Sequence, residues 1–159
     1  MTSTPAPPNR WRPLLVATGV WTLLGAVPAL VDPARTYRRF HAGEPSEDEL
    51  LLFRGSSGQT FLFAVGYLMA AAAPRRHALV VALGGTGKAV YAARLLHEVR
   101  AHRAGPLTLV AAVGDLAFAA GLATFLARSG AARTLLDELP APPAAADVIE
   151  PGRPSDQLR

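Results

Sequence analysis

The chain of 159 residues contains no cysteine, which excludes disulfides, thiolate metal sites, iron–sulfur ligation and cysteine nucleophiles. Charge is also scarce, because only 18% of the residues are charged, against about 25% in a typical soluble domain. The charges crowd into short segments between long apolar runs. Uncharged runs of about 20 residues are what a helix needs to cross the ~30 Å core of a bilayer.

Lysine is almost absent as well, since Lys88 is the single lysine among 16 basic residues and the rest are arginine. The net charge of +4 does not indicate nucleic-acid binding, because the arginines flank the apolar runs instead of forming one stripe. Arginines in such positions are typical of helix ends at a membrane surface. The predicted partner is therefore the lipid bilayer, and no nucleic acid is expected.

Four apolar runs predict an all-α fold, an antiparallel four-helix transmembrane bundle with spans at about residues 13–31, 50–73, 78–97 and 106–127. The first run would extend about 28 Å as a helix, enough to cross. It ends in Asp32-Pro33 and not in a small-residue cleavage site, so a span is favoured over a signal peptide. Ser46 and Glu49 have the spacing of a capping box at the start of the second span. We expect one membrane domain at residues 13–128, with disordered tails at residues 1–12 and 129–159.

The segment of residues 33–45 combines arginines with Tyr37 and Phe40. It fits a short interfacial segment with its arginines among the headgroups, or a patch that admits an anionic lipid or a substrate. Arg54 lies about one turn inside the second span. Its side chain either reaches out to the interface or turns inward to pair with Asp32 or Glu98.

Two motifs in the third span do not complete a known binding site. A phosphate-binding loop ending at Gly87-Lys88 would need a glycine at position 82 and a hydroxyl residue at position 89, and both are alanine. A dinucleotide-binding turn would need a third glycine at position 90, which is Val90. His97 and His102 lack the spacing that places two histidine ligands on one helix face. The sequence therefore predicts no catalytic residue, metal or cofactor.

A charged pair is the stronger signal. Lys88 lies near the middle of the third span and Asp115 near the middle of the fourth, so antiparallel packing places them at matching depth. An unpaired charge at that depth costs about 2.5–3.5 kcal/mol on insertion scales, and pairing reduces that cost. Gln59 reaches a similar depth, and Tyr91 lies one turn from the lysine. We predict a polar centre of Lys88, Asp115, Gln59 and Tyr91. Trp21 lies near the middle of the first span.

Several short motifs together carry a resemblance to a family: Gly66-Tyr67 with Ala70-Ala71, Pro74-Arg75-Arg76-His77, Gly87-Lys88, and Asp115 in the last span. In these the chain resembles small uncharacterised bacterial four-helix integral membrane proteins, loosely similar to the DoxX-like group. The resemblance covers the four spans and omits both tails. It implies a link to membrane redox chemistry with quinone.

Two functions follow from these observations, and the sequence favours a role that is not enzymatic. The first is an accessory or structural subunit of a membrane complex, with small residues such as Ala117 and Gly121 offering a packing face for a membrane protein partner or a second copy. The second is a binder or carrier of a small polar or quinone-like ligand, or of a proton, at Lys88 and Asp115. Lysine suits it because a desolvated lysine can lose its proton, whereas arginine stays charged. We expect a multi-pass protein of the bacterial inner membrane with cytoplasmic termini, because Arg10 and Arg12 disfavour translocation of the N-terminal tail.

Overall fold

The computed structural model describes residues 10–131 and 133, and this part of the chain is all-helical, without β-strands. Its five helices are α1 (Arg12–Val31), α2 (Pro33–Phe40), α3 (Glu47–Ala72), α4 (Ala78–Arg100) and α5 (Thr108–Ser129). The all-α class is therefore as predicted. The tails predicted to be disordered lie almost entirely outside the described residues.

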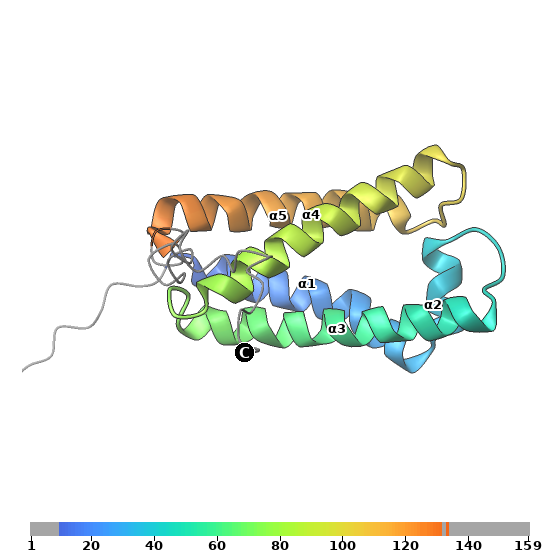
Figure 1. Ribbon diagram of the computed structural model, residues 1–159, viewed down its shortest axis with the longest axis horizontal. Helices are drawn as coiled ribbons and strands as arrows, with labels where there is room; N and C mark the ends of the chain where they lie inside the picture. Colours follow the sequence, from blue (N-terminus) through green and yellow to red (C-terminus); the bar gives the residue numbers. More distant parts are fainter. Residues whose placement is uncertain (1–9, 132, 134–159) are drawn as a thin grey trace, which may run out of the picture.

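The four long helices run alongside one another, and the short α2 crosses one end of them (Figure 1). Successive long helices run in opposite directions. The most extensive contacts are those of α1 with α3 and of α4 with α5, so these helices form two pairs. Smaller contacts between α3 and α4, and between α1 and α5, join the two pairs. Both ends of the described chain lie at the end opposite α2.

Side-chain caps set the starts of α2 and α3. The carboxylate of Asp32 accepts a hydrogen bond from the backbone N–H of Arg35 at 3.0 Å, which satisfies one of the free amides of the first turn of α2. Ser46 and Glu49 form the predicted capping box at α3, with the Ser46 N–H donating to Glu49 Oε2 at 2.8 Å. Tyr37 of α2 donates its hydroxyl to Glu49 Oε1 at 3.0 Å and so ties the two helices together.

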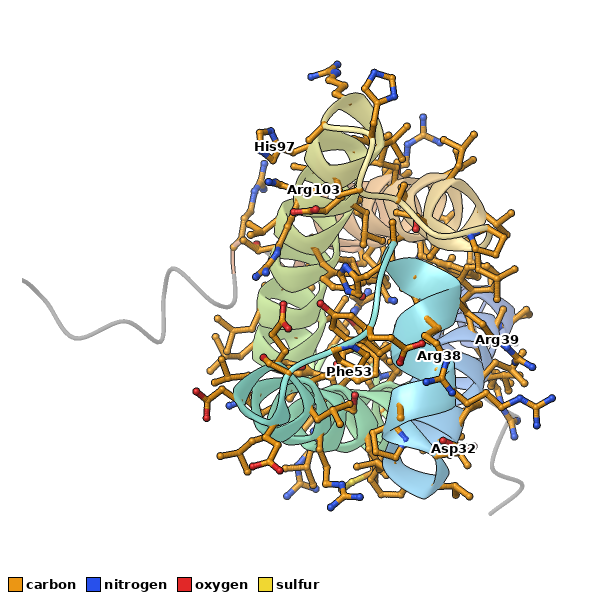
Figure 2. The ribbon with its side chains drawn as sticks, turned by 90° about the vertical axis from the view of Figure 1, so that its right-hand side faces the viewer. Asp32, Arg38, Arg39, Phe53, His97 and Arg103 are labelled. Carbon is orange, nitrogen blue, oxygen red and sulfur yellow. The ribbon has the colours of Figure 1, made fainter. Side chains whose placement is uncertain are left out.

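At the α2 end, backbone hydrogen bonds connect the two helix pairs. The N–H of Ala42 donates to Arg103 O at 2.8 Å, and the N–H of Gly105 donates to Phe40 O at 2.9 Å. A Cβ at Gly105 would lie only 2.6 Å from the carbonyl carbon of Arg39, so glycine permits this approach. Figure 2 looks onto this end, where the exposed Arg38 and Arg39 lie on the outer side of α2.

The interior is built from small residues around a few large ones, among which Leu15, Tyr67, Leu122 and Phe125 are almost fully buried. The outside is strongly apolar, with Leu24, for example, 67% exposed. Within the described residues, three helices are long and apolar enough to cross a membrane: α1, α4 and α5. The helix of the second predicted span, α3, is not among them, because acids occupy its first turn and a polar section follows at residues 54–60.

Candidate functional site

Lys88 of α4 and Asp115 of α5 form a buried ion pair. Lys88 Nζ lies 2.7 Å from Asp115 Oδ1, and the two side chains are only 8% and 10% exposed. The antiparallel packing of α4 and α5 brings these two residues to the same level, as their positions in the sequence indicated. A pair at this distance offsets part of the large cost of removing both charges from water.

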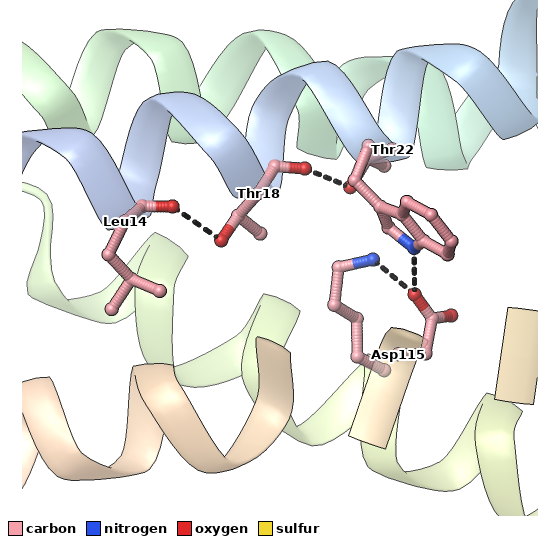
Figure 3. Close-up of polar contacts among 6 residues, drawn as sticks. Leu14, Thr18, Thr22 and Asp115 are labelled. Carbon is pink, nitrogen blue, oxygen red and sulfur yellow. Dashed lines mark hydrogen bonds and ion pairs between the residues drawn. The ribbon is translucent and has the colours of Figure 1, made fainter. Parts of the chain in front are cut away.

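Trp21 of α1 is the third member of this centre. Its indole Nε1 donates a hydrogen bond of 2.9 Å to the same oxygen, Asp115 Oδ1 (Figure 3). The indole fits there because residue 114 is a glycine, whose added Cβ would overlap the Trp21 ring. One carboxylate oxygen therefore joins three helices, α1, α4 and α5.

Aromatic rings border the ion pair. Lys88 Nζ lies 6.0 Å from the ring centroid of Phe118, at the outer limit of a cation–π contact. The rings of Trp21 and Phe118 are 5.8 Å apart and tilted against each other. The buried hydroxyls of α1 do not compete for Asp115, because Thr18 and Thr22 donate to the carbonyls of Leu14 and Thr18 in their own helix (Figure 3).

Tyr67 brings α3 to the same region. Its side chain is 1% exposed, and its hydroxyl has no hydrogen-bond partner among the described residues. The hydroxyl lies against Gly84 of α4, where an added Cβ would overlap it. Gly84 is one helical turn before Lys88 and is buried on the same face of α4. The Asp115 carboxylate is also close enough to act electrostatically on this hydroxyl.

The centre keeps unused hydrogen-bonding capacity. A lysine ammonium has three donors, and Lys88 makes one hydrogen bond to the described part of the chain, which goes to Asp115. Asp115 accepts both of its hydrogen bonds at Oδ1, so within the described residues Oδ2 accepts none. Together with the Tyr67 hydroxyl, these groups could bind a further polar atom.

Three further candidate residues, Gln59, Tyr91 and Arg54, make no hydrogen bond to the Lys88–Asp115 pair. Gln59 was predicted inside the centre, and this was wrong, because its side chain is exposed on α3. Tyr91 is near Asp115 but is 41% exposed and makes no hydrogen bond to the pair. Arg54 is exposed as well. Of the two alternatives predicted for it, the inward pairing with Asp32 or Glu98 is not formed, since Asp32 caps α2 and Glu98 pairs with Arg103 at 3.0 Å.

The predicted packing face on α5 is partly occupied by the chain itself. A Cβ at Gly121 would meet Leu14 of α1 at 2.9 Å, so Gly121 serves the contact between α1 and α5. Ala117 is exposed. This part of α5 is therefore not a continuous free stripe of small residues.

Comparisons with protein-family models, with curated protein sequences and with solved structures find no match to this chain. The resemblance to DoxX-like proteins therefore stays a prediction. Among the described residues, no group of three or more His, Asp or Glu side chains could hold a metal ion.

A second polar region lies at the α2 end. An open hollow of about 420 Å³ is lined by residues of the segment after α2 and of the loop before α5. Arg38 and Glu44 form an exposed ion pair of 2.9 Å at its rim. Burial lowers the pKa of the His41 imidazole, which also lines the hollow, and Glu98 opposes that shift. None of the residues that line the hollow belongs to the Lys88–Asp115 centre.

Proposed function

We propose that the chain is a multi-pass protein of the bacterial cell membrane in which α3 forms a fourth span, and that it serves as an accessory or structural subunit. The three apolar helices and the length of α3, which is 26 residues, support the span assignment. The main support for a structural role is that Asp115 Oδ1 accepts two hydrogen bonds, from two different helices. The carboxylate accepts from Lys88 and Trp21, so the buried charge is neutralised within the chain.

An accessory subunit needs a surface for another chain, and α3 offers one. Leu52, Gly55, Gln59 and Leu62 follow one another at the three- and four-residue steps of a heptad seam, and all four are exposed. The two leucines are 73% and 69% exposed, and an added Cβ at Gly55 would meet nothing within 4 Å. This α3 seam could therefore admit a neighbouring helix at close range.

Depth makes Gln59 the decisive residue of the α3 seam. The hydroxyl of Tyr67 lies at the level of Gly84 along the helix axes. Gln59 precedes Tyr67 by eight residues in α3, which places it about 12 Å nearer the α2 end. Lys88 lies about 6 Å beyond Gly84 in the same direction, so Gln59 is only about 6 Å beyond the level of the ion pair. In a bilayer its amide would face hydrocarbon, where an unpaired polar group costs several kcal/mol.

The proposed occupant of the α3 seam is a second copy of this chain. A carboxamide has both a donor and an acceptor, so Gln59 complements Gln59 of a copy related by a two-fold axis. A single polar residue in an otherwise apolar seam also fixes the register of the two helices. Contact between the two seams would remove the exposed leucines and the amide from lipid together.

The test measures self-association of the full-length chain in vesicles by energy transfer between labelled copies. We expect Gln59→Leu to weaken dimerisation about threefold, since interhelical hydrogen bonds in membranes average about 0.6 kcal/mol, and Gln59→Asn to retain more of it. Ser56→Ala is the matched control, because the Ser56 hydroxyl already donates to Phe53 O in its own helix at 2.9 Å. A monomeric wild type, or full dimerisation of Gln59→Leu, would contradict the proposal.

The second candidate function, binding or carrying a small polar ligand, is favoured by one observation. The buried Tyr67 hydroxyl has no partner in the described chain and lies within a turn of Lys88, whose ammonium has unused donors. Ligand binding at this centre and association at the α3 seam involve different side chains, so one does not exclude the other.

The termini are proposed to be cytoplasmic. Arg10 and Arg12 precede α1 immediately, and a tail with this charge is poorly translocated. Apart from Asp115, every acidic side chain of the described residues lies at the α2 end, whereas the opposite end carries arginines without acidic neighbours in that part of the chain. Such an end is attracted to the anionic cytoplasmic leaflet.

A further inference from the structure

Among the residues that the structure describes, the Tyr67 hydroxyl is the buried side-chain polar group without a hydrogen-bond partner. Burying a hydroxyl without a hydrogen bond is costly, and folded proteins leave few such groups without a protein or water partner. The position is also built to receive the phenol, since glycine at residue 84 leaves the room that the hydroxyl occupies. A leucine or phenylalanine would fill the apolar part of this space without that cost.

Lys88 approaches the same place from α4. Side chains on a helix lean toward its N-terminus, so the stem of Lys88 leans over the turn that contains Gly84. The ammonium is held on one side by Asp115 Oδ1 at 2.7 Å. Two of its three donors remain unused within the described residues, and Gly84, which the Tyr67 hydroxyl touches, lies one turn from Lys88 on the same buried face of α4.

We infer that Tyr67 and Lys88 together bind one uncharged oxygen atom, supplied by a water molecule or by the carbonyl of an apolar compound. The inference rests on the second candidate function and gives it a ligand class. Both side chains donate, the tyrosine through its hydroxyl and the lysine through its ammonium, so their common partner is an acceptor. The acceptor is uncharged because Asp115 already balances Lys88, and an added charge in the membrane interior would be unpaired.

The first test is the sign of the change in melting temperature for Tyr67→Phe in the detergent-purified full-length protein. If the hydroxyl is bridged, the variant loses hydrogen bonds and its Tm falls by about 2–4 °C. If the hydroxyl is unpaired, its removal leaves the Tm unchanged or raises it, and the inference is overturned. Tyr91→Phe is the matched control, because it removes a hydroxyl from an exposed tyrosine that makes no hydrogen bond in the described chain.

The second test separates the two sources of the oxygen with 2-undecanone and undecane as probes. A carbonyl acceptor predicts that the ketone raises the Tm of the wild type and that the alkane does not. It also predicts that neither probe changes the Tm of Tyr67→Phe. Equal responses of the wild type to both probes, with a lower Tm for Tyr67→Phe, would identify water. A rise of equal size in the wild type and in Tyr67→Phe would overturn the role of Tyr67.

These outcomes are independent of the proposed self-association. Tyr67 is buried inside the chain, whereas Gln59 is exposed on the α3 seam. Energy transfer between labelled copies of Tyr67→Phe should match the wild type even where the Tm falls. A negative result for the bridged oxygen at Tyr67 therefore does not contradict the accessory role. A negative result for dimerisation does not contradict the bridged oxygen.

Discussion

Trp21 and Lys88, on helices that are not neighbours in the sequence, donate to the same carboxylate oxygen of Asp115, at 2.9 and 2.7 Å. This arrangement couples α1 to the α4–α5 pair at the centre of the chain. Elsewhere the contacts between α1 and α5 are few. The carboxylate therefore connects the two helix pairs in the interior, in addition to the α3–α4 contacts and the backbone hydrogen bonds at the α2 end.

The ion pair should behave as a mutual pair in a double-mutant cycle. Lys88→Met or Asp115→Leu alone leaves one buried charge without its partner, and each should lower the stability by about 3 kcal/mol. The combined variant removes both charges and should recover most of that loss. Thermal unfolding in detergent measures the cycle, and Arg38→Met with Glu44→Leu, an exposed pair at 2.9 Å, should change stability by less than about 1 kcal/mol.

If the single substitutions at Lys88 and Asp115 leave the stability unchanged and their effects are additive, the ion pair does not stabilise the packing of the helices. A double variant that folds as well as the wild type but loses a host phenotype would instead assign the pair to function.

Trp21→Phe should destabilise the protein while keeping an aromatic ring beside Phe118. The variant removes the indole N–H, and a hydrogen bond to a charged group is worth about 1.5–3 kcal/mol. In the Asp115→Leu background the same substitution should cost much less, because the acceptor is already gone. Equal costs in both backgrounds would show that Trp21 acts by packing alone.

Three glycine-to-alanine substitutions in α4 and α5 should differ in sign. Gly84→Ala and Gly114→Ala should destabilise, because the new Cβ would overlap the Tyr67 hydroxyl and the Trp21 ring. At Gly87 an added Cβ meets nothing within 4 Å, so Gly87→Ala should stabilise by about 0.5–1 kcal/mol through helix propensity. Chemical or thermal unfolding of the three variants checks this, and a common sign for all three would refute the proposed contacts.

Acidification should weaken the α2 end. Burial lowers the pKa of His41 below its value in the unfolded chain, so around and below pH 6.5 the unfolded state takes up the proton more readily. Stability should therefore fall between about pH 7 and pH 5, and the loss should be absent in His41→Gln. Amide hydrogen exchange in α2 at the two pH values measures it, and an equal pH dependence in the variant would assign the effect to another group.

The absence of cysteine makes the topology directly testable. A cysteine introduced at position 3 should be protected from a membrane-impermeant maleimide added to intact cells, because the termini are proposed to be cytoplasmic. A cysteine in place of Ala101, an exposed residue at the α2 end, should be labelled. The reverse pattern would place the termini outside.

Much of the architecture could be predicted from the sequence, because helix ends depend on local interactions. Asp32-Pro33 ends α1, and the Ser46–Glu49 box starts α3, as their spacing indicated. The matching depth of Lys88 and Asp115 also followed from two similar apolar runs joined by a short connection. The caps involve residues only a few positions apart in the sequence, and the matching depth follows from the constant rise per residue of an α-helix.

The composition of the centre was decided by the tertiary structure. Gln59 and Tyr91 have suitable depth, but the rotation of each helix about its axis leaves both side chains exposed. Trp21 reaches the pair because Gly114 leaves space for its ring, and Gly84 leaves space for the phenol of Tyr67 one helical turn before Lys88. Periodicity gives depth along a helix, whereas the direction of a side chain depends on how large and small residues of different helices fit together. The sequence alone determined an apolar, helical chain with a charged pair at one level, and the packing determined which residues surround that pair.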